Sequence, residues 1–420
     1  MAKQVIGEFK LNKKSPSDQK KDVRFQDAVC HTPEMPLFGS RPGRPPIYPV
    51  VAYECESPVQ ADSRLGGQEP GYVYQRNGHP NAASLAEKCK QLHRADQAVI
   101  ANSGQSVAAL AMISQLKSGD HVVLSNRLYG GTSHMFGSQA ERLGVTSTRV
   151  EVTDLDAVRN AMRPETKMVV IETISNPLLR VADLEVIAEI THSGSHPTGT
   201  VLLVDNTFAS PMMCRPLEFG ADLVIESMTK IMNGHGDVVA GLLCGKDSVW
   251  KDTTELLALW GWTSSAMDCW MVDRGLATLF VRQKVACENA NQLAHSVGQF
   301  AGVDRVDYPG LESHPDFDLA GKLFTNTATG NVPLYGTMVS IHLAGGANAA
   351  KDFIQRVEHI PFCPTLGELH TTLSHPASTS HRGLTAEQRA ELGISDGTIR
   401  LSIGLESVEF IESAIRQALG

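Results

Sequence analysis

Residues 201–230 read VLLVDNTFASPMMCRPLEFGADLVIESMTK, and they carry the strongest indication of how this chain folds. The apolar runs at 201–204 and 223–225 have the pattern of buried strands. Asp205 follows the first run, and Lys230 ends a Ser-Met-Thr-Lys turn after the second. The carboxyl ends of parallel strands meet at one edge of an open α/β sheet, where ligands bind. The acid and the amine are therefore expected to face one small molecule.

An acid and a lysine in this arrangement suit pyridoxal phosphate. Its aldehyde forms an imine with a lysine amine, and its ring nitrogen needs a carboxylate partner to stay protonated. Taken alone, a strand-terminal Asp is more often a helix cap, and a Lys beyond a strand is more often a solvated charge. Several polar residues flank this pair, and they favour a ligand site over a helix cap and a solvated charge. These residues are Asn206, Thr207, Ser227 and Thr229.

Composition and charge restrict the class of protein. The chain has 420 residues, of which 42% are apolar and 20% charged, so it is long enough for two globular domains. The formal net charge is −9, and residues 1–24 hold seven Lys or Arg against three Asp or Glu. This local charge of +4 leaves −13 on the remainder, which disfavours binding to nucleic acid.

Targeting signals, cysteines and histidines point to an ordinary cytoplasmic protein without a metal. No apolar run is long enough to cross a membrane, and the N-terminus has no signal-peptide pattern. The eight cysteines are scattered without a C-x-x-C pair, which predicts free thiols. His192 and His196 have metal-ligand spacing, but Gly194 and Pro197 between and beside them predict a loop, so no metal site is expected.

The chain is expected to form a basic, irregular N-terminal arm and two domains. The arm is placed at residues 1–65, and an irregular region is predicted over 25–80, because these residues are rich in Pro and Gly and show little periodicity. From about residue 82, apolar strands alternate with helical stretches, which predicts a mostly parallel sheet in a large domain, 66–275. A single long helix over about 265–300 is predicted to lead into a smaller α+β domain, 276–420.

Two further motifs suit the same ligand. Ser103, Gly104 and Gln105 stand between a predicted strand and a predicted helix, where backbone N–H groups and the helix N-terminus favour a phosphate. An ordinary strand-to-helix turn would have the same pattern. Tyr129, in a loop after the next strand, is placed to stack on an aromatic ligand, although a structural tyrosine is equally compatible with the local sequence.

Taken in order, these motifs resemble the Cys/Met-metabolism pyridoxal phosphate enzymes, the trans-sulfuration family. That family includes cystathionine γ-synthase, cystathionine β- and γ-lyases, methionine γ-lyase and the homoserine-ester sulfhydrylases. The motifs that carry the resemblance are YQRNGHPN (74–81), SGQ (103–105), YGGT (129–132), ETISNP (172–177), DNTFASP (205–211), SMTK (227–230), NGHGD (233–237), RGLATL (274–279), HPASTSH (375–381) and IRLSIGLE (399–406).

The resemblance implies a fold-type I, aminotransferase-like architecture with a mostly parallel seven-stranded sheet and a smaller C-terminal α+β domain. It also implies a homotetramer, built as a dimer of dimers, whose active sites are shared across the dimer. Lys230 matches the imine-forming lysine, Asp205 the ring-nitrogen partner and Tyr129 the stacking tyrosine. Matching cofactor ligands are Ser103, Gly104, Gln105, Asn176, Thr207, Ser227 and Thr229, joined by Tyr74 and Arg76 from the neighbouring subunit. Arg400 and Thr365 match residues that bind the substrate carboxylate.

The implied activity is γ-elimination or γ-replacement on a sulfur amino acid or a homoserine derivative. Alternatives are an O-acetyl- or O-succinylhomoserine sulfhydrylase and a non-catalytic regulatory subunit with the same fold. Val73 and Pro364 replace acidic residues that hold the distal amino group of cystathionine in related lyases, which favours substrates without a cation at that end.

Three residues depart from the usual pattern of the family. Glu226 stands where relatives often have His, and its carboxylate is expected to raise the pKa of Lys230. Ile231 and His79 are the other two, and all three motivate the regulatory alternative.

Overall fold

The computed structural model describes residues 42–193, 199–325 and 330–420. The basic segment 1–24, Cys30 and His196 therefore lie outside the described residues. The chain divides into two compact units, 1–45 and 46–420, and every element below belongs to the second unit. The boundaries at 65/66 and 275/276 stay predictions.

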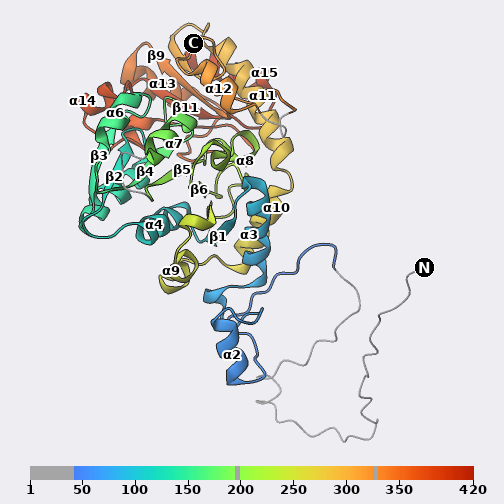
Figure 1. Ribbon diagram of the computed structural model, residues 1–420. Coiled ribbons are helices and arrows are strands. Elements are labelled where there is room, and N and C mark those ends of the chain that lie inside the picture. The colour runs from blue at the N-terminus through green and yellow to red at the C-terminus, as the bar shows by residue number, and fades with distance from the viewer. Residues whose placement is uncertain (1–41, 194–198, 326–329) are drawn as a thin grey trace, which may run out of the picture. The chain divides into compact units, whose positions relative to one another are not determined.

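A seven-stranded sheet forms the centre of the large domain (Figure 1). All neighbouring pairs are parallel except those of β7, which runs antiparallel to both β1 and β6. This confirms the expected mostly parallel sheet. In sheet order the strands are β1 Gln97–Ala101, β7 Gly241–Gly245, β6 Leu223–Ser227, β5 Val201–Asp205, β4 Thr166–Glu172, β2 His121–Ser125 and β3 Thr146–Val150.

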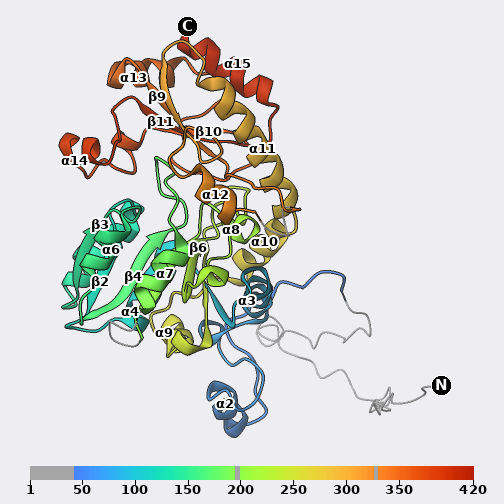
Figure 2. The same cartoon turned by 45° about the horizontal axis from the view of Figure 1, so that its top comes forward.

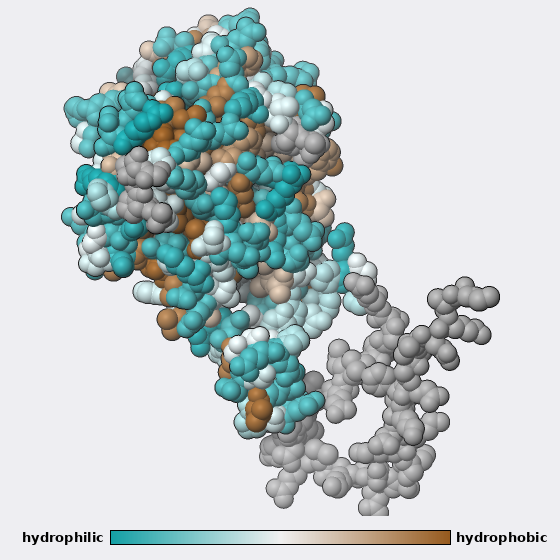
Figure 3. Space-filling model, viewed as in Figure 1, coloured by the Kyte–Doolittle hydropathy of each residue, from teal (hydrophilic) through white to brown (hydrophobic). Residues whose placement is uncertain are grey.

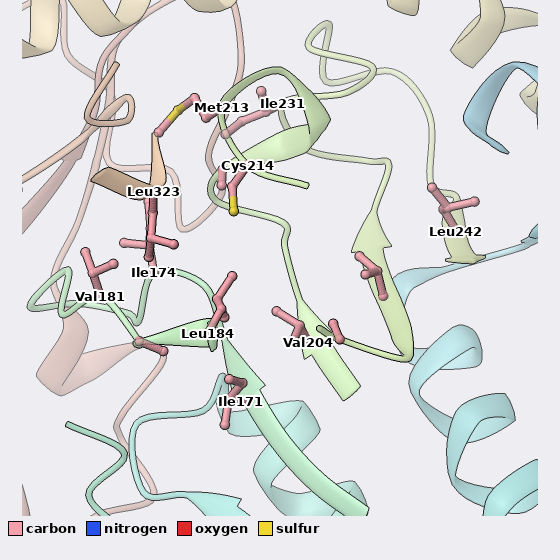
Figure 4. Packing of buried hydrophobic residues seen from close by; sticks show 14 of the residues in the cluster. Ile171, Ile174, Val181, Leu184, Val204, Met213, Cys214, Ile231, Leu242 and Leu323 are labelled. Carbon is pink, nitrogen blue, oxygen red and sulfur yellow. The ribbon is translucent and has the colours of Figure 1, made fainter. Parts of the chain in front are cut away.

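Both faces of this sheet are covered, because alternate strand residues enter two separate apolar clusters. Ile171 and Val204 belong to the first cluster, with residues of α3, α6 and α7, and Figure 4 shows part of it. Val170 and Leu203 belong to the second, with residues of α4 and α9. The covering elements are α3 Pro80–His93, α4 Gly104–Gln115, α5 Gly130–His134, η2 Met135–Gln139, α6 Leu155–Ala161, α7 Leu184–His192, α8 Ser210–Met213, η3 Pro216–Phe219, η4 Asp247–Val249, α9 Thr253–Leu259 and α10 Ala266–Leu276.

A smaller antiparallel sheet forms the C-terminal part (Figure 2), as the α+β pattern predicts. Its order is β10 Thr372–Ser374, β11 Thr398–Ser402, β9 Met338–Leu343 and β8 Val303–Asp307. Residues of α11 Leu279–Val297, α13 Gly346–Arg356 and α15 Val408–Leu419 share an apolar cluster with these strands. The remaining elements here are α12 Phe317–Leu323, η6 Pro376–Ser378 and α14 Ala386–Glu391.

The predicted long helix over 265–300 is wrong, because the structure has two helices there, α10 and α11. The break falls at Ala277 and Thr278. The carbonyl of Gly275 accepts hydrogen bonds from the Thr278 hydroxyl at 3.2 Å and from Arg282 Nη2 at 3.0 Å. Side chains therefore satisfy the groups at the break, and glycine is a weak helix former.

The predicted irregular region before residue 80 is also not wholly irregular. It contains α2, Pro58–Leu65, and the short helix η1, Gln75–Asn77. Ser57 caps α2 by accepting a hydrogen bond from Gln60 N, and Pro58 occupies the first turn, where a missing N–H costs nothing.

The surface and helix composition carry one further observation. Within the ranges that the structure describes, no helix has the length and apolar character needed to span a membrane. On the face drawn in Figure 3, hydrophilic residues predominate and apolar residues gather in small patches.

Candidate active site

A cavity of about 580 Å³ lies at the carboxyl edge of the large sheet. Its volume falls in the range of about 300–1,000 Å³ that is typical of small-molecule sites. Glu172, Asp205 and Ser227 are the last residues of the adjacent strands β4, β5 and β6, and all three line it. It also brings together the other predicted site residues except Tyr74 and Arg76, namely Ser103, Gly104, Gln105, Tyr129, Asn176, Thr207, Thr229, Lys230, Thr365 and Arg400.

One end of the cavity is built to receive an anion. Ser103 caps α4, its hydroxyl accepting a hydrogen bond from Ser106 N at 3.1 Å, so the helix N-terminus opens here. A Cβ atom at Gly104 would lie 2.9 Å from Ser227 Cβ, so only glycine allows α4 to approach the end of β6.

Asp205 is held in place by Thr207. The Thr207 hydroxyl donates to Asp205 Oδ1 at 2.6 Å, and Thr207 N–H donates to the same oxygen at 3.0 Å. Burial raises the pKa of Asp205, and these two hydrogen bonds oppose the rise without cancelling it. The Thr207 hydroxyl also accepts from Ser227 N at 2.9 Å, which ties the end of β5 to the end of β6.

Lys230 reaches into the cavity, and its Nζ donates a hydrogen bond to Thr365 Oγ1 at 2.9 Å. Burial lowers the pKa of Lys230, and the nearby Arg400 guanidinium lowers it further. The expectation that Glu226 raises this pKa is therefore wrong. Burial raises the pKa of Glu226 itself well above its usual value, which favours the neutral form of that carboxyl. Its Oε1 accepts from Asn206 Nδ2 at 2.9 Å and lies 3.3 Å from His93 Nε2.

The turn that follows Lys230 is braced by a buried arginine. Arg282 donates from Nη1 to the carbonyl of Ile231 and from Nη2 to that of Met232, both at 3.1 Å. Gly234 has φ +74°, and a Cβ atom there would lie 1.8 Å from Arg282 Nη1. The glycine is thus required both by its left-handed backbone and by the arginine beside it.

Arg400 is a buried cation on β11. Its Nη1 donates to Asn176 Oδ1 and its Nη2 to the carbonyl of Thr365, both at 3.0 Å. Nε is buried and has no hydrogen-bond partner in the described part of the chain. Burial lowers the pKa of Arg400 to about 10, so the group stays charged near neutral pH.

Glu172 is a site residue that the sequence analysis did not single out. Tyr129 N–H donates to Glu172 Oε1 at 2.6 Å, and a hydrogen bond from Asn176 N–H also reaches this carboxyl. Burial and the nearby Asp205 raise the pKa of Glu172 well above its usual value. In the β4–β5 register Glu172 lies opposite Asp205, and a strand-terminal acid at this position was the signal that could have revealed it.

Tyr74 and Arg76 do not line this cavity. The Tyr74 side chain is exposed, and the Arg76 guanidinium lies 5.7 Å from its ring centre. Arg76 Nη1 also donates to the carbonyl of Ala258 in α9 at 3.0 Å. Val73 and Pro364 stand where related lyases have acidic residues. Pro364 lines the cavity, whereas the carbonyl of Val73 accepts a backbone hydrogen bond from Tyr53.

His79 and Ile231, which also depart from the usual pattern of the family, are both buried side chains. His79 is buried and caps α3, because its Nδ1 accepts from Ala82 N at 3.3 Å. Ile231 is buried in the first apolar cluster. Of the histidine pair considered for a metal, His192 lies 2.7 Å from Asp222 through its Nε2.

The polar groups of the cavity fit pyridoxal phosphate. The α4 N-terminus and the hydroxyls of Ser227 and Thr229 suit a phosphate, and Asp205 suits a ring nitrogen. Glu172 Oε2, like Gln105 Oε1, is buried without a partner among the described residues, so the cavity still offers polar atoms to a ligand.

Comparisons with known proteins agree with this fit. A sequence profile described as Cys/Met metabolism PLP-dependent enzyme matches residues 34–420. The chain is 36% identical to an L-methionine gamma-lyase from Fusobacterium nucleatum subsp. polymorphum, over 89% of this chain and 92% of that protein. It is 34% identical to an O-succinylhomoserine sulfhydrylase from Pseudomonas aeruginosa, over 89% and 90%. The crystal structure of cystathionine gamma synthase from Xanthomonas oryzae pv. oryzae in complex with cystathionine superposes with a TM-score of 0.81, at 34% identity over 90% of this chain and 92% of that one.

Proposed function

The chain belongs to the Cys/Met metabolism PLP-dependent enzymes and is a pyridoxal phosphate enzyme of γ-elimination or γ-replacement, and we propose that it acts on a four-carbon amino acid bearing sulfur or an ester oxygen at Cγ. One observation carries the proposal. The amine of Lys230, the carboxyl of Asp205 and the guanidinium of Arg400 line the same cavity. A base, a carboxylate that keeps the ring nitrogen protonated, and a cation that binds the substrate carboxylate are the groups that this chemistry requires.

The residues that hold the cofactor and substrate are proposed as follows. Ser103, Gly104, Gln105, Ser227 and Thr229 bind the phosphate. Asp205, positioned by Thr207, faces the ring nitrogen, Tyr129 stacks on the ring and Asn176 contacts the ring hydroxyl. Arg400 and Thr365 bind the substrate α-carboxylate. When bound, pyridoxal phosphate supplies a protonated ring that accepts the electrons left behind at Cα.

Lys230 is proposed as the base that moves protons at the substrate carbons. Its lowered pKa keeps more of the amine neutral near physiological pH, and only a neutral amine can accept a proton. The amine would first take the proton from Cα, and it has to release that proton before it can accept the one lost at Cβ, a loss that allows the γ substituent to leave. The hydrogen bond to Thr365 Oγ1 places the amine next to Arg400, whose Nη2 binds the Thr365 carbonyl. Thr365 thereby holds Lys230, the proposed base, close to Arg400, the proposed ligand of the substrate carboxylate.

A substrate panel tests the function. We expect the purified enzyme to convert at least one of methionine, homocysteine, cystathionine, O-acetylhomoserine and O-succinylhomoserine. Without an added thiol the expected products are a 2-oxo acid and ammonia. With sulfide or cysteine, replacement is expected to yield a new thioether or thiol. Mass spectrometry of the mixtures measures both outcomes, and a panel in which every substrate stays unchanged would contradict the proposal.

We also propose that the enzyme is a homotetramer whose sites are completed across a dimer, with Tyr74 and Arg76 binding the phosphate in the partner subunit. Two features support this. Both residues are outside their own cavity, and Arg76 is anchored to α9 through the carbonyl of Ala258. At the end of α9, Leu259 and Trp260 leave 69% and 56% of their surface exposed, which suits burial against another subunit.

Subunit complementation tests the shared site. We expect Lys230→Ala and Arg76→Ala each to be strongly impaired. Random pairing of the two variants leaves one intact site in each mixed dimer, so co-expression should restore about a quarter of wild-type activity. Steady-state turnover of the co-expressed, doubly tagged protein measures the gain. Co-expressing Lys230→Ala with Asp205→Asn is the matched control, because neither site of that mixed dimer is intact. Equal activity of the two mixtures would contradict a shared site.

A cytoplasmic location is proposed as well. The seven cysteines that the structure describes are free thiols, and five of them are buried. Such thiols suit a reducing compartment.

A further inference from the structure

The cavity contains a third cation, Arg382, that the proposed reaction does not use. Lys230 serves as the base and Arg400 as the ligand of the α-carboxylate. The side chain of Arg382 is exposed, and within residues 42–193, 199–325 and 330–420 it has no hydrogen-bond or ion-pair partner. A charged group that lines an active-site cavity without a partner is available to a ligand.

The loop that carries Arg382 is fixed by its own hydrogen bonds. Ser378 Oγ lies 2.9 Å from His375 Nδ1, the Thr379 hydroxyl donates to the carbonyl of His375 at 2.8 Å, and Ser380 Oγ lies 2.8 Å from His381 Nδ1. These three hydroxyl residues line the cavity as well. Their hydroxyl groups are engaged within the loop, which leaves Arg382 as its free polar group.

This loop lies beside the predicted stacking residue. A Cβ atom at Gly130 would be 3.1 Å from the carbonyl oxygen of Ser380, so the loop packs against the start of α5, next to Tyr129. The acids that line the cavity are Glu172, Asp205 and Glu226, which belong to the strand ends and already have partners there. Within the described residues Arg382 forms no ion pair with any of these acids, and it belongs to the C-terminal part of the chain.

We propose that Arg382 binds a carboxylate at the far end of the substrate's γ substituent, so the preferred substrate is a homoserine ester of a dicarboxylic acid. This inference rests on the proposed function. An arginine fork binds a carboxylate through two parallel hydrogen bonds, which suits a carboxylate better than a methylthio or acetyl group. Cystathionine also has a distal carboxylate, but it carries an ammonium group beside it. Among the described residues, the acids that line the cavity are the three at the strand ends, and the lining residues Val239 and Pro364 are apolar, so they offer that cation no further acid.

Kinetics with paired substrates test the inference. We expect wild type to prefer O-succinyl-L-homoserine over O-acetyl-L-homoserine by about tenfold or more in kcat/KM. Arg382→Ala should lower kcat/KM for the succinyl ester by about 10- to 100-fold, the range for loss of a charge-assisted hydrogen bond. The acetyl ester and methionine should change by less than about twofold, because neither has a group for the arginine to bind.

Two variants serve as comparisons. Arg382→Lys keeps the charge but loses the fork, so it should recover part of the preference. Arg356→Ala removes an exposed arginine at the end of α13, outside the cavity, and should leave both esters unaffected. A loss that is equal for the two esters, or no loss for the succinyl ester, would overturn the role of Arg382.

A binding measurement separates this inference from the proposed function. The compounds 4-(succinyloxy)butanoate and 4-acetoxybutanoate lack the amino group, so they bind without reacting. Calorimetry of the cofactor-loaded enzyme should give about tenfold or tighter binding of the succinyloxy compound, and Arg382→Ala should remove the difference. If no substrate turns over, the proposed function fails while these affinities still decide the role of Arg382. If substrates turn over and the two affinities are equal, the inference alone fails.

Discussion

Lys230→Ala is expected to reduce turnover on every substrate by about 10³-fold or more, since removing a positioned proton-transfer group typically costs 10²- to 10⁴-fold. The variant loses the amine that donates to Thr365 Oγ1, and no other lysine in the described part of the chain lines the cavity. The protein should still fold, because the neighbouring turn is held by backbone groups and by Arg282 rather than by the lysine side chain.

Covalent trapping provides a second measurement. Borohydride treatment of wild type should leave a pyridoxyl group on the peptide that contains Lys230, and the variant should show none. Lys351→Ala, which changes an exposed lysine in α13, is the matched control and should behave as wild type in both assays. Undiminished turnover in Lys230→Ala would refute the assignment of the base.

Asp205→Asn is expected to lower kcat by about 10²- to 10³-fold, the range found when one preorganised electrostatic partner is removed. The change is nearly isosteric, and an Asn oxygen can still accept the hydrogen bonds that Thr207 donates to Asp205 Oδ1. The loss should therefore come from the missing negative charge and not from rearrangement. Borohydride trapping at Lys230 should be retained, which separates this defect from that of Lys230→Ala.

The assignment of Asp205 as the ring-nitrogen partner also predicts how activity depends on pH. Burial raises the pKa of Asp205, so its carboxylate is protonated at a higher pH than a free aspartate. Activity should fall as pH decreases through that raised pKa, and the Asn variant should lack this acidic limb. Asp304→Asn, at an exposed position of β8, is the control. A variant that keeps wild-type kcat would exclude Asp205 as the ring-nitrogen partner.

The strands that carry the site were predictable because each is a short apolar run buried on both faces. β5 and β6 appear where the sequence places them, and their terminal residues meet that of β4 at one edge. The antiparallel strand β7 was missed because GLLCG is short and has glycine at both ends. Its position depends on distant contacts instead: a Cβ atom at Gly241 would lie 2.1 Å from the carbonyl oxygen of Ser103.

The site was predictable only where a residue type and its place on a strand sufficed. Glu172 and Arg382 escaped the sequence analysis because their importance arises from partners, or from a lack of them, in the folded chain. Glu226 was misjudged for a related reason. It is close to Lys230 in sequence, but its carboxyl is buried against Asn206 and His93, and burial raises its pKa.

The arginine brace behind Lys230 has a consequence for the catalytic cycle. Lys230 N–H donates to the carbonyl of Ser227 at 3.0 Å, Gly234 N–H donates to the carbonyl of Lys230 at 2.8 Å, and Arg282 fixes the two carbonyls that follow. In each turnover the amine must leave the coenzyme and later return. With its main chain anchored on both sides, that excursion has to come from rotation about the side-chain bonds of the lysine. The enzyme can therefore return to its starting state through movement of this one side chain, while the backbone around it keeps its conformation.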